Sequence, residues 1–260
     1  MDLQLELKVA KLEQQTLLIT VQGEDVLLFE DHAKGKVLND EVVIPDIVQL
    51  FVELTNRGML SGSTYAPWKS QAEVLQTEVD LPNQRQSWQI RIQSLDPNAF
   101  WVLVNLLSAR NFSKVTIKTL DTYSESTEST TWLTFNQLKP PSYFQSLPFQ
   151  LDREEPERTS RNRVVQIVFA QEPEIDFVEI VYKDLEIWTQ AVMLGAYPRP
   201  GQPSREAGGF PDGVYQLDAF TVEQSFSEIF VSDESAFFAV INYACKLHHT
   251  QFPVQAVCVQ

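Results

Sequence analysis

Hydrophobic positions recur at helical spacing in two stretches of the chain. Residues 96–107 carry Phe100, Leu103 and Val104 at the i, i+3, i+4 spacing, and most of their other positions are also apolar. Residues 233–244 are also largely apolar. A helix that is apolar nearly all round is buried on more than one side, so we expect each helix to lie between a sheet and another element.

Alternating apolar and polar positions on both sides of these helices predict β-strands. The expected strands precede the two helices at residues 88–92 and 225–231 and follow them at residues 115–120 and 254–259. Strand, helix and strand therefore come in the same order in both parts of the chain.

Each part also contains an earlier expected helix that ends at a glycine. The pattern predicts helices at residues 45–57 and 176–194, closed by Gly58 and Gly195, because glycine readily adopts the left-handed conformation after a helix. Further expected strands lie at residues 3–9, 17–21, 26–29, 131–135 and 164–169.

The two parts resemble each other at a fixed offset of 137 positions. Between residues 96–107 and 233–244, four of the twelve positions are identical, namely Asp96/Asp233, Ala99/Ala236, Phe100/Phe237 and Asn105/Asn242. The same offset superposes Gly58 on Gly195 and Phe51 on Trp188. Two segments that agree on one offset indicate an internal duplication.

These patterns together predict an α+β fold of internally duplicated strand–helix–strand units, with mixed or antiparallel sheets, buried helices packed on them and a pseudo-twofold arrangement. We expect a first repeat with its N-terminal strands at residues 1–138 and a second repeat at residues 163–260. Residues 139–162 are rich in proline and charge and are expected to link the repeats. The aromatic residues of this linker suggest that it packs along the surface.

Charge narrows the classes of partner. The chain has 260 residues, of which 43% are hydrophobic, with 20 Lys and Arg against 35 Asp and Glu, for a net charge of −15. A field of this sign repels phosphate backbones and anionic membranes, so we expect neither nucleic acid nor a membrane as partner. A negative field favours a basic or neutral protein as partner, if the chain has one. The sequence leaves the oligomeric state open.

Cysteine usage and the first residues indicate the cytoplasm. Only Cys245 and Cys258 are present, too few for a disulfide framework in a chain of this length. Residues 1–6 alternate apolar and polar side chains and lack the basic and apolar regions of a secretory signal. No stretch approaches the roughly 20 apolar residues that cross a bilayer.

Catalytic and metal-binding signatures are absent from the sequence. It contains no Gly-x-Ser-x-Gly elbow and no P-loop or dinucleotide-binding glycine pattern. Cys245, His248, His249 and Cys258 are the only arrangement that resembles a metal-ligand set, and their placement on an expected helix and strand favours structural roles. We therefore expect no catalytic residue, no metal and no cofactor.

Two loops that follow the earlier helices contain residues typical of binding surfaces. The candidate binding residues are Tyr65 and Trp68 in the first repeat and Tyr197, Arg199, Phe210 and Asp212 in the second. Aromatic side chains give a large contact area at low entropic cost, and prolines flank Arg199. The alternative interpretation is that these aromatics fold back on the core.

The sequence favours a non-catalytic soluble protein that binds another macromolecule through these loops or through the cleft between the repeats. The alternative is an enzyme or small-molecule-binding protein with its site in that cleft, where duplicated folds often place one. A purely structural or assembly role is a third interpretation. A pocket with convergent polar groups would favour the second of these functions.

Overall fold

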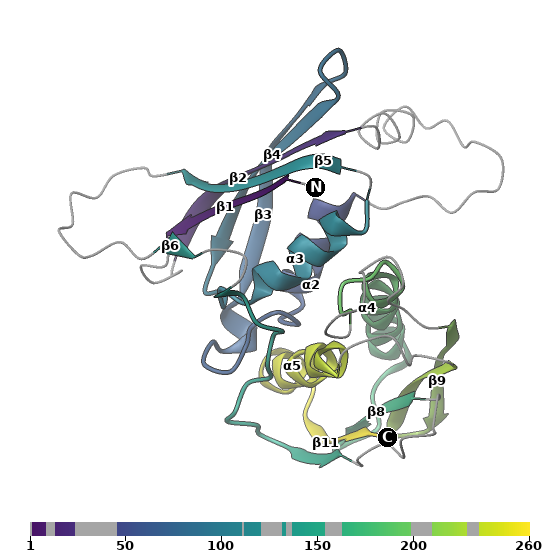
Figure 1. Ribbon diagram of the computed structural model, residues 1–260. Coiled ribbons are helices and arrows are strands. Elements are labelled where there is room, and N and C mark those ends of the chain that lie inside the picture. Colours follow the sequence, from purple (N-terminus) through teal and green to yellow (C-terminus); the bar gives the residue numbers. More distant parts are fainter. Residues whose placement is uncertain are drawn as a thin grey trace.

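The computed structural model describes residues 2–8, 14–23, 46–110, 112–120, 132–133, 137–153, 163–198, 210–227 and 234–260. In these residues the chain forms four α-helices, a short 3-10 helix and two mixed β-sheets. Figure 1 shows the helices gathered between the two sheets, so that the layers run sheet, helices, helices, sheet. The fold is therefore α+β.

The first half of the chain forms a six-stranded sheet in the order β3-β4-β2-β5-β1-β6. Its strands are β1 (Asp2–Lys8), β2 (Gln14–Gly23), β3 (Gln71–Asp80), β4 (Arg85–Gln93), β5 (Phe112–Leu120) and β6 (Trp132–Leu133). Its helices are α2 (Ile47–Asn56), η1 (Pro67–Lys69) and α3 (Ala99–Ser108). The pair β1–β5 is parallel, and the other pairs are antiparallel.

The second half forms a five-stranded sheet in the order β7-β11-β8-β10-β9. Its strands are β7 (Gln150–Arg153), β8 (Arg163–Phe169), β9 (Phe210–Asp218), β10 (Thr221–Ser227) and β11 (Val254–Val259). Its helices are α4 (Ile175–Met193) and α5 (Ser235–Thr250). The pair β7–β11 is parallel, and the other pairs are antiparallel.

The two sheets have corresponding strand orders. Five strands of the first sheet, β3-β4-β2-β5-β1, match the reversed listing of the second, β9-β10-β8-β11-β7. In both sheets the first three pairs in this order are antiparallel and the last pair is parallel. The last strand, β1 or β7, is the first strand of its half along the chain. The helices also fall at the same places in the order of elements.

The long helices and the alternating strands lie close to their predicted positions. All four α-helices overlap the predicted ranges, and so do the strands β1, β2, β4, β5, β6, β8, β10 and β11. The sequence patterns did not indicate β3, β7 and β9. The expected strand at residues 26–29 lies outside the described residues.

Gly58 and Gly195 end α2 and α4 in the same way. Their φ angles are +74° and +82°, the left-handed conformation that favours glycine. In each case the N–H after the glycine donates to the carbonyl oxygen five positions earlier, at 3.0 Å in both halves. A Cβ atom at Gly58 would lie 2.7 Å from the carbonyl oxygen of Pro67, so a side chain there would also clash.

Buried aromatic rings join the two helices within each half. Phe51 of α2 and Phe100 of α3 have ring centroids 5.7 Å apart, and at the offset of 137 Trp188 of α4 and Phe237 of α5 lie 6.0 Å apart. Phe51, Phe100 and Trp188 are fully buried. Because α3 and α5 lie between a sheet and other helices, they are buried on more than one side, as their apolar patterns predict.

The segment between the halves packs along the protein. Tyr143, Leu147, Phe149 and Leu151 are partly buried against the hydrophobic core, and β7 adds to the edge of the second sheet beside β11. Among the helices of the described residues, none combines the length and apolar character needed to cross a membrane.

Candidate functional site

The two buried asparagines connect the halves reciprocally. Asn105 Nδ2 donates to the carbonyl oxygen of Ala196 at 3.4 Å, and Asn242 Nδ2 donates to that of Met59 at the same distance. At the offset of 137, Ala196 corresponds to Met59. Each asparagine thus bonds to the residue that follows the helix-ending glycine of the other half. Asn242 Oδ1 also accepts from the backbone N–H of Phe144 at 2.8 Å.

A charged cluster lies where α2, α4 and α5 meet. Arg57 Nε donates to Asp184 Oδ1 at 2.6 Å, and the hydroxyl of Tyr243 donates to Asp184 Oδ2 at 2.9 Å. Arg57 also pairs with Glu53 one turn earlier on α2. The Arg57 and Asp184 side chains are only 20% and 14% exposed, so the ion pair is largely shielded from solvent.

Electrostatics keep this cluster in its paired form. Burial raises the pKa of Tyr243 well above its usual value, and the negative charge of Asp184 raises it further. Burial by itself would lower the pKa of Arg57, but its hydrogen bonds and ion pairs with Glu53 and Asp184 outweigh this and raise it. Burial also opposes ionisation of Glu53, yet its bonds to Arg57 and Gln49 leave its pKa lowered.

Beside the cluster lies a polar cavity of about 410 Å³. Its lining residues are Asn56, Gln71, Ala72, Glu73, Arg91, Ile92, Gln93 and Lys246. All of these come from the first half except Lys246, which reaches across from α5 and donates to the carbonyl oxygen of Asn56. The cavity is therefore built by both halves. Its volume falls within the range of about 300–1,000 Å³ of ligand pockets.

The groups around the cavity are fixed in place. The side chain of Asn56 bonds to both backbone groups of Ala72, at 2.8 and 2.9 Å. Arg91 pairs with Glu73 at 2.6 Å. Burial lowers the pKa of Lys246, and the nearby charge of Arg57 adds to this while that of Asp184 opposes it. The ammonium group is thus a donor held in a partly dry position.

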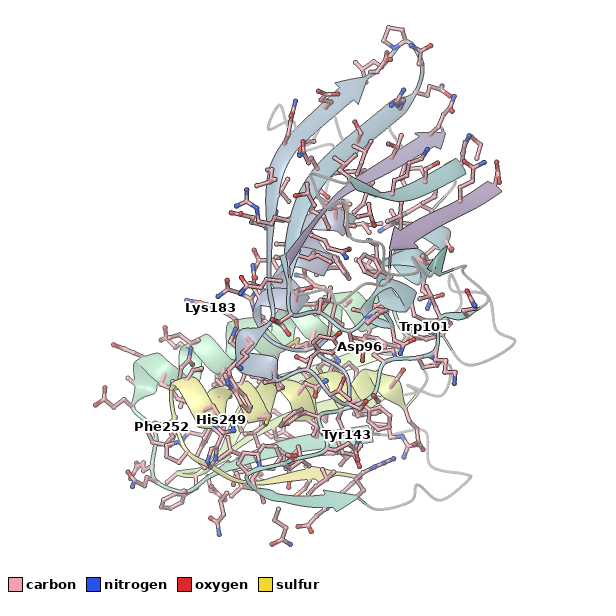
Figure 2. The ribbon with its side chains drawn as sticks, turned by 90° about the vertical axis from the view of Figure 1, so that its left-hand side faces the viewer. Asp96, Trp101, Tyr143, Lys183, His249 and Phe252 are labelled. Atoms are coloured by element: carbon pink, nitrogen blue, oxygen red, sulfur yellow. The ribbon has the colours of Figure 1, made fainter. Side chains whose placement is uncertain are left out.

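An aromatic cluster lies on the same face of α5 as Lys246. Trp68 of η1 packs on His249 of α5 with ring centroids 3.7 Å apart, and Phe144 meets Trp68 edge-on at 5.6 Å. Figure 2 shows His249 near the end of α5. His249 follows Lys246 by three residues, so both side chains lie on one face of the helix. We refer to the cavity and the Trp68–His249 pair together as the junction site.

The structure places the predicted binding residues in different surroundings. Tyr65 and Trp68 are half-buried, and Trp68 belongs to the junction site. Tyr197 is fully buried, where its hydroxyl has no hydrogen-bond partner among the described residues, and burial raises its pKa. Its side chain folds back on the core, as the alternative interpretation of the loops holds, and contacts Trp101 at a ring distance of 6.5 Å.

The other predicted binding residues are Arg199, Phe210 and Asp212. Arg199 is outside the described residues. Phe210 and Asp212 belong to the strand β9 and not to a loop, because the chain forms the hairpin β9–β10 where the glycines and prolines suggested a long connection. Only the backbone of these two residues is described.

The cysteines and histidines of the possible metal set have separate roles. Cys245 is buried, which raises the pKa of its thiol to about 12. Cys258 lies 3.9 Å from Asp152, and His248 Nδ1 contacts the backbone of Val254 at 3.0 and 3.2 Å. Neither cysteine forms a disulfide. In the described part of the chain, no three potential ligands are placed to share an ion.

Sequence reasoning missed the charged residues of the junction, namely Glu53, Arg57, Asp184, Tyr243 and Lys246. None belongs to a motif, and Arg57 and Asp184 are 127 positions apart. One signal was present, since Lys246 is a charged residue in the otherwise largely apolar α5 and directly follows the buried Cys245. A charged residue at such a position needs a partner.

Two of the comparisons with known proteins find no match. No protein-family model matches the chain, and no curated protein matches its sequence. Among solved structures, a conserved protein from Enterococcus faecalis V583 is 5% identical over 91% of this chain and 74% of that chain. The TM-score of this pair is 0.15.

Proposed function

We propose that the chain arose by duplication of one unit and that its halves pack about a pseudo-twofold axis. Three observations support this: the corresponding strand orders, the identical ends of α2 and α4, and the reciprocal bonds of Asn105 and Asn242. Reciprocity of this kind is characteristic of a twofold interface. A superposition of the halves in which the matched helices and strands fail to align would contradict the proposal.

We propose that this is a non-catalytic protein of the cytoplasm that binds another protein at the junction site. The observation that carries the proposal is the position of Trp68, which is half-buried on His249, one helical turn along α5 from Lys246 of the polar cavity. Tryptophan is enriched among the residues that dominate binding energy, particularly beside pockets. The cavity adds directional donors from Lys246 and Arg91.

The chemistry of the junction site indicates what a partner would present. An aromatic or proline side chain suits the exposed part of Trp68, since such flat groups stack on indole. An acidic or amide side chain suits the cavity, where Lys246, Gln71 and Gln93 offer hydrogen-bond donors. A net charge of −15 favours a partner that is basic or neutral elsewhere on its surface.

The same cavity supports the second candidate function, a small-molecule-binding protein or an enzyme. Its volume falls within the range of ligand pockets, and the lowered pKa of Lys246 is typical of functional amines. The two candidate functions differ in their need for Trp68. A protein partner would contact the exposed part of Trp68, whereas a small molecule held within the cavity does not require it.

Site-specific photo-crosslinking in the source cell tests protein binding at the junction. We expect benzoylphenylalanine at position 68 to give discrete adducts of higher mass, because the partner must lie against this ring. Mass spectrometry then identifies the adduct. The matched control carries the same group at Gln255, an exposed position on the strand β11.

Crosslinking at position 212 decides between the junction and the start of β9, where Phe210 and Asp212 lie. Adducts from position 68 that are absent at positions 212 and 255 support the junction site. Adducts from position 212 alone would move the binding surface to the start of β9. The absence of adducts at both 68 and 212 would contradict the proposed function.

A further inference from the structure

A second polar cavity lies on the six-stranded sheet and not at the junction. It has a volume of about 290 Å³, and its lining residues Leu18, Thr20 and Gln22 alternate along β2 with the core residues Leu17 and Ile19, so it opens on the face away from the core. The lining residues are Gln4, Leu18, Thr20, Val21, Gln22, Arg85, Lys114, Thr116 and Lys118. This lining includes three cations and no acid, in a protein whose net charge is −15.

Strand register brings the basic and hydroxyl groups together. Gln22 of β2 lies directly opposite Arg85 of β4 on one side and Lys114 of β5 on the other. Two strand spacings therefore separate the two cations, which is about 10 Å between backbones. In the adjacent row, Thr20 lies opposite Thr116. Long basic side chains at such positions can converge over the amide and hydroxyl groups between them.

The two carboxylates opposite these cations make hydrogen bonds to amide groups instead. Asp80 lies opposite Arg85, but its carboxylate accepts from Asn83 at 2.7 Å. Asp2 lies opposite Lys114, and its carboxylate accepts from Gln4 at 3.5 Å. Within the described part of the chain, neither Arg85 nor Lys114 forms an ion pair.

The second sheet provides an internal comparison. One outer row of this sheet crosses the strands through Tyr215, Glu223, Gln166, Cys258 and Asp152. Glu223 accepts hydrogen bonds from Gln166 at 2.6 Å and from Tyr215. The first-sheet row through Arg85 and Lys114 also carries two carboxylates, Asp80 and Asp2, but the second-sheet row has no cation, so the paired cations are a feature of the first sheet.

We propose that this cavity binds a compact phosphate-bearing small molecule. A guanidinium fork, an ammonium group, hydroxyls and amides supply many donors over a small area, which suits a dianion with several oxygens better than a single carboxylate. The volume, near the lower end of the range for ligand pockets, limits the ligand to a compact one. The negative field of the whole protein repels a nucleic-acid chain.

Isothermal titration calorimetry with inorganic pyrophosphate at constant ionic strength tests this inference. The wild-type protein is expected to show saturable binding with a Kd below about 1 mM. Combining Arg85→Ala with Lys114→Ala is expected to weaken binding at least roughly tenfold, because both charge-assisted contacts are lost. Circular dichroism checks that this variant remains folded. The control Lys183→Ala, an exposed lysine on α4, is expected to bind as the wild type does.

Citrate in a parallel titration distinguishes phosphate from carboxylate chemistry. We expect citrate to bind at least roughly tenfold more weakly than pyrophosphate. Equal or tighter binding of citrate would overturn the assignment of phosphate. No saturable binding of pyrophosphate up to about 10 mM, or wild-type affinity in the double variant, would overturn the site itself.

Discussion

Phe100→Ala is expected to lower the free energy of unfolding by about 3–5 kcal/mol. Phe100 is fully buried on α3, where its ring packs against Phe51 of α2. Because α3 lies between the first sheet and the helices of the second half, its surroundings have little freedom to collapse into the space left by the ring. Equilibrium unfolding in urea measures the change.

Two further variants test the position of Phe100 in the core. Phe237→Ala should have a comparable effect, since Phe237 packs against Trp188 in the second half at a similar ring distance. Leu217→Ala is the control, because Leu217 is 52% exposed on β9. A loss below about 1 kcal/mol in both phenylalanine variants would show that α3 and α5 are peripheral to stability.

Asp184→Ala is expected to cost about 2–4 kcal/mol of stability, because it leaves Arg57 and the hydroxyl of Tyr243 partly buried without their acceptor. The side chain of Asp184 is 14% exposed, so solvent offsets only part of the loss. Urea unfolding measures this change as well.

Matched variants separate the ion network from a general effect on α4. Asp184→Asn retains one carbonyl acceptor and should lose less stability than Asp184→Ala. Glu186→Ala removes an exposed carboxylate from the same helix and should change stability by less than about 0.5 kcal/mol. If Asp184→Ala is as mild as this control, the network does not hold the halves together.

The helices were predictable from sequence because each buries a broad apolar face. The strands β3 and β9 were not, since both lie at sheet edges. The strand β3 is largely exposed along its length. Its sequence, Gln-Ala-Glu-Val-Leu-Gln-Thr-Glu-Val-Asp, therefore contains little alternation of apolar and polar residues. Such a strand is specified mainly by its hydrogen bonds to β4, which leave no periodic signal in the side chains.

The junction site was only partly predictable. Trp68 could be selected because a tryptophan in a loop beside proline is typical of binding surfaces. Its contact with His249 and the contact of Arg57 with Asp184 join residues more than a hundred positions apart, and spacing carries no information about such pairs. Tyr197 lies in a similar context of aromatic residues and prolines, yet it is fully buried whereas Trp68 is half-buried. A single sequence does not reveal this difference in burial.

The affinity of the crosslinked partner for Trp68→Ala tests the proposed binding site most directly. We expect the dissociation constant to rise at least about tenfold, because truncating an aromatic residue at the centre of an interface typically costs more than 1 kcal/mol. Phe220→Ala, which removes a 45% exposed ring elsewhere on the surface, serves as the control and should bind normally. Wild-type affinity in a folded Trp68→Ala protein would contradict binding at the junction site.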